Sequence, residues 1–130
     1  MRLLLDTHAW LWWISSPSRL RPEALAVIAA RENQVLLSAV SALEISIESA
    51  LGKLALNEPA EEFVPKWAQR TRVDELPIEF RHALRAGALP AHHRDPFDRL
   101  LIAQAQIEGV PILTADRQLA AYAVEIIAAE

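Results

Sequence analysis

The stretch PFDRLLIAQAQIEGVPILTAD, residues 96–116, contains both kinds of element from which the fold can be predicted. Its first half has apolar residues three or four positions apart, as on the buried face of a helix, and Gly109 is suited to ending that helix. Its second half is a short apolar run, as in a strand buried on both faces, and Asp116 follows the run directly. A helix, a buried strand and an acidic residue therefore succeed one another.

The same alternation extends over the rest of the chain. Apolar runs predict further strands at 2–5, 35–40 and 124–128, and an edge strand at 72–78. The segments between them predict helices at 6–15, 22–32, 41–54, 58–70, 78–89 and 116–122, with polar loops at 16–22 and 90–96. Short buried strands separated by helices indicate an α/β fold with a parallel sheet covered on both faces. A length of 130 residues fits a single domain, 1–130.

The composition predicts a soluble cytoplasmic protein. Cysteine is absent, so neither a disulfide framework nor a thiolate metal site is available, which suits a reducing compartment. The apolar run from Leu3 is interrupted by Asp6 and His8, so neither a signal peptide nor a membrane span fits. The net charge of −4 argues against a general nucleic-acid coat protein, but it is compatible with an enzyme whose acidic centre holds cations.

Acidic residues follow the predicted strands with unusual regularity. Asp6 comes directly after the run 2–5, and Asp116 after the run that ends at 115. Glu44 and Asp98 each lie in the first turn of a predicted helix. Because functional crevices in parallel sheets lie outside the carboxyl ends of the strands, these four acids are expected to converge at one edge of the sheet.

Helix capping is the alternative explanation for each acid taken singly. Asp6 and Asp116 occupy positions where a carboxylate can accept backbone N–H groups at a helix start. Ser41 and Glu44 match the Ser-x-x-Glu capping box, and Asp95 precedes the helix that begins at Pro96.

Two observations favour a shared site over capping alone. First, two of the acids lie at the top of helical stripes that are expected to face the core: Val40, Glu44, Ile47 and Leu51 in one helix, and Asp98, Leu101, Ile102 and Ala105 in the other. A carboxylate in that position is costly unless its charge is compensated. Second, four acids at one edge repel one another unless they share a cation. Carboxylate oxygens favour Mg²⁺ or Mn²⁺, ions used in phosphodiester cleavage.

Four motifs carry a resemblance to a known family: LLLDTHAWLW at 3–12, SAVSALEISI at 38–47, DPFDRLLIAQA at 95–105 and ILTADRQL at 112–119. Over nearly its whole length the chain resembles PIN-domain ribonucleases of the VapC toxin type. The resemblance implies a three-layer α/β/α sandwich with a parallel central sheet. It also implies a Mg²⁺- or Mn²⁺-dependent endoribonuclease that a cognate VapB-like antitoxin inhibits. The toxin would be a homodimer, forming a heterotetramer or a larger assembly with the antitoxin.

Carried over residue by residue, the catalytic and metal-binding acids of the family fall on Asp6, Glu44, Asp98 and Asp116. Asp95 is a second candidate in the third motif. It is interpreted as the helix N-cap, because Asp98, unlike Asp95, tops the buried stripe.

Four further residues beside these acids are candidates for contacts with substrate: Thr7, Thr114, Arg99 and Arg117. Either threonine is placed to position a metal-bound water, with backbone hydrogen bonding as the alternative. The two arginines each neighbour a proposed ligand and are suited to holding substrate phosphates, with ordinary solvation as the alternative.

Other polar residues are interpreted as surface groups. His8, His82, His92 and His93 lack metal-ligand spacing on a common helix face, although contact of His92 or His93 with RNA is an alternative. Glu48, one turn beyond Glu44, is interpreted as exposed, with a position facing the site as the alternative.

The tryptophans of the first predicted helix point to a partner. Trp10, Trp12 and Trp13 cannot all face one core, so at least one is expected to reach a partner surface.

Three other functions are considered. One is a housekeeping PIN-domain RNA-processing nuclease without an antitoxin. A phosphatase of the haloacid dehalogenase type needs a second acid two residues after the first, and His8 stands there. A binding module without activity is disfavoured because all four acids are intact.

Overall fold

The computed structural model describes residues 1–130 and contains a five-stranded, fully parallel sheet in the order β3-β2-β1-β4-β5. The strands are β1 (Arg2–Leu5), β2 (Gln34–Ser38), β3 (Asp74–Leu76), β4 (Ile112–Thr114) and β5 (Ile126–Ala128). In the central register Leu4 of β1 is paired with Leu36 of β2 and Ile112 of β4. The parallel sheet and the edge position of β3 confirm the sequence prediction.

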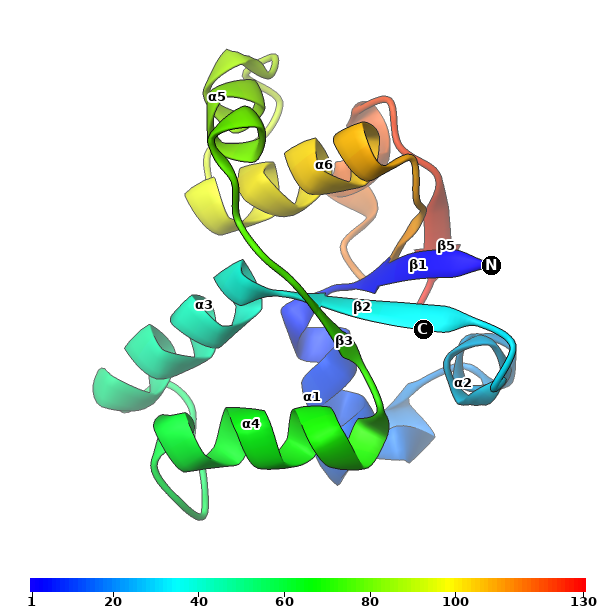
Figure 1. The fold of residues 1–130 in the computed structure, drawn as a ribbon, viewed down its shortest axis with the longest axis vertical. Coiled ribbons are helices and arrows are strands. Elements are labelled where there is room, and N and C mark those ends of the chain that lie inside the picture. Colours follow the sequence, from blue (N-terminus) through cyan, green and yellow to red (C-terminus); the bar gives the residue numbers. More distant parts are fainter.

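Helices cover both faces of this sheet, as Figure 1 shows. They are α1 (Thr7–Ser15), α2 (Pro22–Ala29), α3 (Ala39–Ala50), α4 (Ala60–Thr71), α5 (Phe80–Ala88) and α6 (Pro96–Glu108), with short 3₁₀ helices η1 (Pro17–Arg19) and η2 (Arg117–Ala121). The α5 and α6 helices lie on one side of the sheet and α1, α2 and α4 on the other, while α3 extends from the end of β2. The protein is therefore a three-layer α/β/α sandwich, as the resemblance implied.

The alternation of side chains along β1 divides the interior into two cores. Leu4 packs in the core beneath α6, whereas Leu3 and Leu5 pack in the core on the α1 side. All three leucines are fully buried. This is the geometry of a strand whose successive side chains point to opposite faces, both of them covered. This burial on both faces explains why the three positions 3–5 are all apolar.

Several element boundaries differ from the sequence prediction, most importantly at the start of α3. The strand ends at Ser38 and the helix begins at Ala39, because the Ser38 side chain accepts a hydrogen bond from the Val40 N–H (3.0 Å) and caps the helix there. The capping box predicted for Ser41 and Glu44 is therefore wrong. The helix predicted at 22–32 ends at Ala29, and the one predicted at 116–122 is a 3₁₀ helix.

The buried stripe predicted along α3 is only half correct. Val40 and Glu44 are buried, but Ile47 and Leu51 are 39% and 63% exposed. The α3 helix leaves the sheet at the end of β2, so the face that carries Ile47 is not covered, whereas Glu48 and Ser49 remain half-buried. The stripe of α6 is buried as predicted, with Leu101, Ile102 and Ala105 in the core.

None of the helices combines the length and the hydropathy that crossing a bilayer requires.

Candidate active site

The first acid lies where β1 ends, beside the end of β4. Asp6 follows Leu5, is 8% exposed, and its Oδ2 accepts a hydrogen bond from the Thr114 hydroxyl (2.5 Å). Although Asp6 occupies the N-cap position of α1, its side chain makes no capping hydrogen bond. Helix capping therefore does not explain the presence of Asp6 here. Its hydrogen bond with Thr114 of β4 holds the carboxylate at the edge of the sheet.

Thr114 connects Asp6 to the last acid. Its hydroxyl oxygen accepts a hydrogen bond from the Asp116 N–H (3.0 Å) while its proton is donated to Asp6. Asp116 Oδ1 in turn accepts from the Gln118 N–H (2.9 Å) and caps η2. One oxygen of Asp116 is thus used for capping, as the alternative interpretation predicted, and Oδ2 is left to face the site.

Glu44 reaches the same edge from α3. It is 9% exposed, and a hydrogen bond connects its carboxyl to Thr7, whose Oγ1 also contacts Ser41 Oγ (2.8 Å). Burial raises the pKa of Glu44, and the charges of Glu48 and Asp6 raise it further, while the Thr7 hydrogen bond and His8 oppose the change.

Asp98 is the most strongly perturbed acid. Asp95 caps α6, accepting from the N–H groups of Phe97 (2.8 Å) and Asp98 (3.3 Å), which confirms its predicted role. The Asp98 carboxyl is free of that task. Burial raises its pKa to about 7, and the charges of Asp95, Asp6 and Glu44 add to the shift while His93 opposes it.

The four acids thus form one electrostatically connected group. Thr114 links Asp6 to Asp116, and the charges of Asp6 and Glu44 both act on Asp98. The raised pKa values of Glu44 and Asp98 come chiefly from burial and also from neighbouring carboxylates, which His8 and His93 offset only in part. A hard divalent cation with oxygen ligands would supply that compensation, and the donor set fits Mg²⁺ or Mn²⁺.

Two histidines interpreted as surface residues are buried or nearly so, and that interpretation is wrong for both. His93 is 17% exposed in its side chain, and its Nε2 lies 2.8 Å from Asp98 Oδ2 and 3.4 Å from Asp116 Oδ2. The only sequence feature that indicates the position of His93 is its place in the loop before α6, because that loop has to reach the sheet edge where α6 begins. His82 is fully buried in α5.

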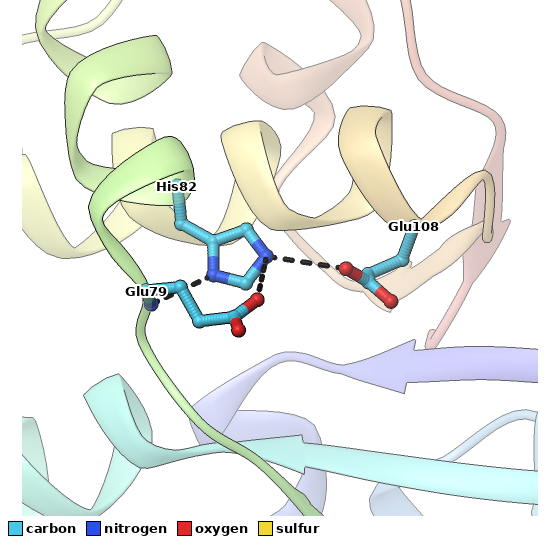
Figure 2. Close-up of side chains that lie close together, drawn as sticks. All are labelled: Glu79, His82 and Glu108. Carbon is cyan, nitrogen blue, oxygen red and sulfur yellow. Dashed lines mark hydrogen bonds and ion pairs between the residues drawn. The ribbon is translucent and has the colours of Figure 1, made fainter.

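His82 belongs to a second cluster, with Glu79 and Glu108 (Figure 2). Its Nδ1 accepts a hydrogen bond from the Glu79 N–H (3.0 Å), so Nε2 carries the ring proton and faces Glu108 Oε2 at 3.2 Å. A protonated ring nitrogen cannot bind a metal. Glu108 also pairs with Arg81 (2.9 Å) and lies 3.7 Å from Arg2. This cluster is therefore a junction between α5, α6 and β1.

The junction predicts a pH dependence of stability. The His82 hydrogen bond, with the charges of Arg81 and Arg2, lowers the pKa of Glu108. A lowered pKa in the folded state contributes stability above the unfolded value of 4.5, and that stability is lost as the pH falls through the folded value. Glu108→Gln should therefore cost about 1.5–3 kcal/mol at pH 7, with the difference from wild type shrinking below pH 4.5 in urea melts.

Glu79→Gln is the matched control for this prediction, because the Glu79 side chain is half-exposed and should cost much less. A Glu108→Gln penalty that persists undiminished at pH 3 would contradict the electrostatic explanation.

The two candidate arginines differ. The Nη1 and Nη2 atoms of Arg99 donate to four backbone carbonyls at 2.9–3.0 Å, those of Ala86, Leu89, Pro90 and His93. Arg99 therefore holds the loop before α6 in place. Arg117 is exposed and forms no ion pair within the protein, so its guanidinium is accessible beside Asp116.

Glu48 faces inward, and its interpretation as a solvent-exposed residue is wrong. Its Oε2 is buried without a hydrogen-bond partner, and its charge contributes to the raised pKa of Glu44. The spacing of one helical turn from Glu44 was the signal for this position.

Comparison with known proteins identifies the family. The PIN-domain family model matches residues 3–125. The chain is 30% identical over 118 residues to ribonuclease VapC22 of Mycobacterium tuberculosis, covering 90% of this chain and 88% of that protein. Among solved structures, VapBC2 of Rickettsia felis bound to a DNA fragment from their promoter superposes with a TM-score of 0.74 and 14% identity over the whole of both chains. A toxin–antitoxin complex from Klebsiella pneumoniae gives a TM-score of 0.67 and 20% identity over 97% and 96%.

The family match includes four of the five strands and all four acids, and the similar structures share the fold over nearly their full length. The chain therefore belongs to the PIN-domain family.

Proposed function

We propose that this protein is a metal-dependent endoribonuclease that acts in the cytoplasm as the toxin of a toxin–antitoxin pair. The observation that carries the proposal is the convergence of Asp6, Glu44, Asp98 and Asp116 at the carboxyl edge of the sheet, where burial and neighbouring carboxylates raise the pKa values of Glu44 and Asp98. The similarity to a relative named as a ribonuclease supports the substrate class. RNA cleavage by the purified protein, measured with and without a chelator, tests it.

The four acids would hold Mg²⁺ or Mn²⁺ through their carboxylate oxygens. The bound dication would activate water for attack and neutralise the charge that develops on the phosphate. Thr114 fixes one Asp6 oxygen, leaving the other for the cation, and Thr7, whose hydroxyl donates to Ser41, lies beside the Glu44 carboxyl. In this proposal both threonines act on the acids and not directly on water. Arg117 is the exposed cation that would pair with a phosphate of the RNA.

An antitoxin has a suitable binding surface on the α1 side of the sheet. A groove of about 540 Å³ between α1, α4 and the segment before α4 is lined chiefly by apolar side chains: Leu11, Ile14, Leu54, Leu56, Phe63 and Trp67. An amphipathic helix inserts apolar anchors into a groove of this kind. The similar structures from Rickettsia felis and Klebsiella pneumoniae are toxin–antitoxin complexes, which supports a small antitoxin as the occupant.

The tryptophans fit this arrangement in part. Trp10 is fully buried, and its Nε1 donates to Thr71 Oγ1 (3.0 Å), whereas Trp12 and Trp13 are half-buried. All three nevertheless pack in or against the same core, so the prediction that they cannot share one core is wrong. Neither half-buried tryptophan lines the groove, so the anchors proposed for the antitoxin move to Ile14 and its neighbours.

The homodimer remains a prediction. Large apolar side chains on α3, directly after it and on α5 are exposed, and a second copy would bury them. They are Leu43 and Ile47 of α3, Leu51 directly after it, and Phe80 and Leu84 of α5.

A further inference from the structure

The imidazole of His93 lies between two of the proposed metal ligands. Its Nε2 is 2.8 Å from Asp98 Oδ2, at the start of α6, and 3.4 Å from Asp116 Oδ2, beyond the end of β4. The nitrogen is buried and forms an aligned hydrogen bond with neither oxygen. It therefore faces the space between two carboxylates that come from different elements.

The other ring nitrogen fixes which of the two carries the proton. Nδ1 accepts a hydrogen bond from the Arg94 N–H (3.1 Å), so in the neutral ring the proton is on Nε2. A ring nitrogen that carries a proton cannot ligate a metal. What His93 presents to Asp98 and Asp116 is an N–H dipole with its positive end toward both.

The backbone of His93 is held in place on both sides. Its N–H donates to the hydroxyl of Tyr122 (2.8 Å), which itself donates to the Pro90 carbonyl (2.9 Å). Its carbonyl accepts from Arg99 Nη1 (3.0 Å). Tyr122 is nearly buried, and Arg99 holds three further carbonyls of the same segment. The loop is thus organised before any ligand arrives.

We propose that His93 is a positioning residue of the metal site, holding the carboxylates of Asp98 and Asp116 together through its Nε2–H. The N–H dipole of His93 offsets the repulsion between the two carboxylates. It also attracts Asp98 Oδ2, so that Oδ1 faces the cation. Groups that orient metal ligands in this way typically contribute 10- to 100-fold to metal affinity. The inference rests on the proposed function, since it presupposes a cation at these acids.

The test is calorimetric titration of Mn²⁺ into the purified protein and into two variants of equal side-chain length, His93→Gln and His93→Met. The amide of glutamine retains an N–H donor near the position of Nε2, and the thioether of methionine does not. His93→Met should bind Mn²⁺ about 10- to 100-fold more weakly than wild type, whereas His93→Gln should recover most of that loss. Arg94→Ala, an exposed neighbour, is the control and should bind normally.

Melting curves in EDTA establish that both variants are folded, so a structural defect common to them would be seen. Unchanged or tighter binding of Mn²⁺ by His93→Met overturns the inference. It would mean that the imidazole has no effect on metal binding or competes with the ion. An equal loss in both variants also overturns it, because that would indicate direct ligation. Failure of the wild-type protein to bind Mn²⁺ would contradict the proposed metal site itself.

Discussion

Replacing Asp98 by Asn should reduce RNA cleavage by more than about 100-fold. Removal of a group that only orients a metal ligand typically costs 10- to 100-fold, and loss of a ligand should cost more. Asp98 is half-buried at the start of α6, and the charges of Asp6 and Glu44 act on it. Asparagine keeps the shape of the side chain but lacks the charge that would hold the cation. Initial rates on a labelled RNA in Mg²⁺ measure the effect.

Asp95→Asn is the matched control, three residues away in the same motif. Asp95 caps α6 through Oδ1, and asparagine caps helices about as well as aspartate. This variant should keep substantial activity. Equal losses in the two variants would mean that the charge of the helix start, and not Asp98 as a ligand, supports cleavage.

The same Asp98→Asn variant should be more stable than wild type when metal is absent. Burial raises the pKa of Asp98 to about 7, so its ionised form opposes folding above that pH. A raised pKa in the folded state means that the penalty is relieved as the pH falls and the carboxyl takes up a proton. In EDTA, the variant should therefore melt above wild type at pH 8, and the difference should diminish at pH 6. A lower melting temperature at pH 8 would contradict the repulsion that the site geometry implies.

Binding of an antitoxin should abolish cleavage, and Ile14→Asp should restore it. Ile14 lines the groove beside Phe63 and Trp67, and a carboxylate at this position would lose its hydration when an apolar helix docks. An antitoxin arginine that reached the acidic site would pair with the carboxylates in place of a cation. We therefore expect a small protein encoded next to this gene to co-purify with the wild type and to inhibit its cleavage of RNA. The same small protein should neither bind nor inhibit Ile14→Asp.

Ile78→Asp is the control for the groove, since Ile78 is 38% exposed between β3 and α5 and lies outside both the groove and the surface proposed for the homodimer. This variant should still bind the neighbour-encoded protein and be silenced. A neighbour that neither binds nor inhibits the wild type would favour the alternative of a housekeeping RNA-processing nuclease.

The layer structure could be predicted from the sequence because the central strands β1, β2 and β4 each contain consecutive apolar residues. Leu3, Leu4 and Leu5 have to be buried on both faces, and only a parallel sheet between helix layers does this. The same reasoning predicted that the four acids lie at the carboxyl edge of the sheet. Local capping rules were less decisive, because Ser38 and Ser41 are both suitable caps and only the length of β2 selects the first.

The remainder depended on tertiary contacts that leave no periodic signal. His93 is in a loop, and its position follows from Tyr122 and Arg99, which contact its backbone from other elements. His82 was missed because its partner Glu108 is 26 residues away. The exposure of Ile47 follows from the direction in which α3 leaves the sheet, which a helical stripe does not encode.

The most direct test of the acidic site is the cation dependence of RNA cleavage, measured on one preparation of the wild-type protein. Asp98→Asn, purified in the same way, is the control that reveals contaminating nucleases. Cleavage should cease in excess EDTA and return when Mg²⁺ or Mn²⁺ is added beyond the chelator. Ca²⁺ should restore it poorly, because its coordination is larger and looser. Full cleavage by the wild type in excess EDTA, absent from Asp98→Asn, would show a metal-free mechanism and contradict the assignment of the four acids as a cation site.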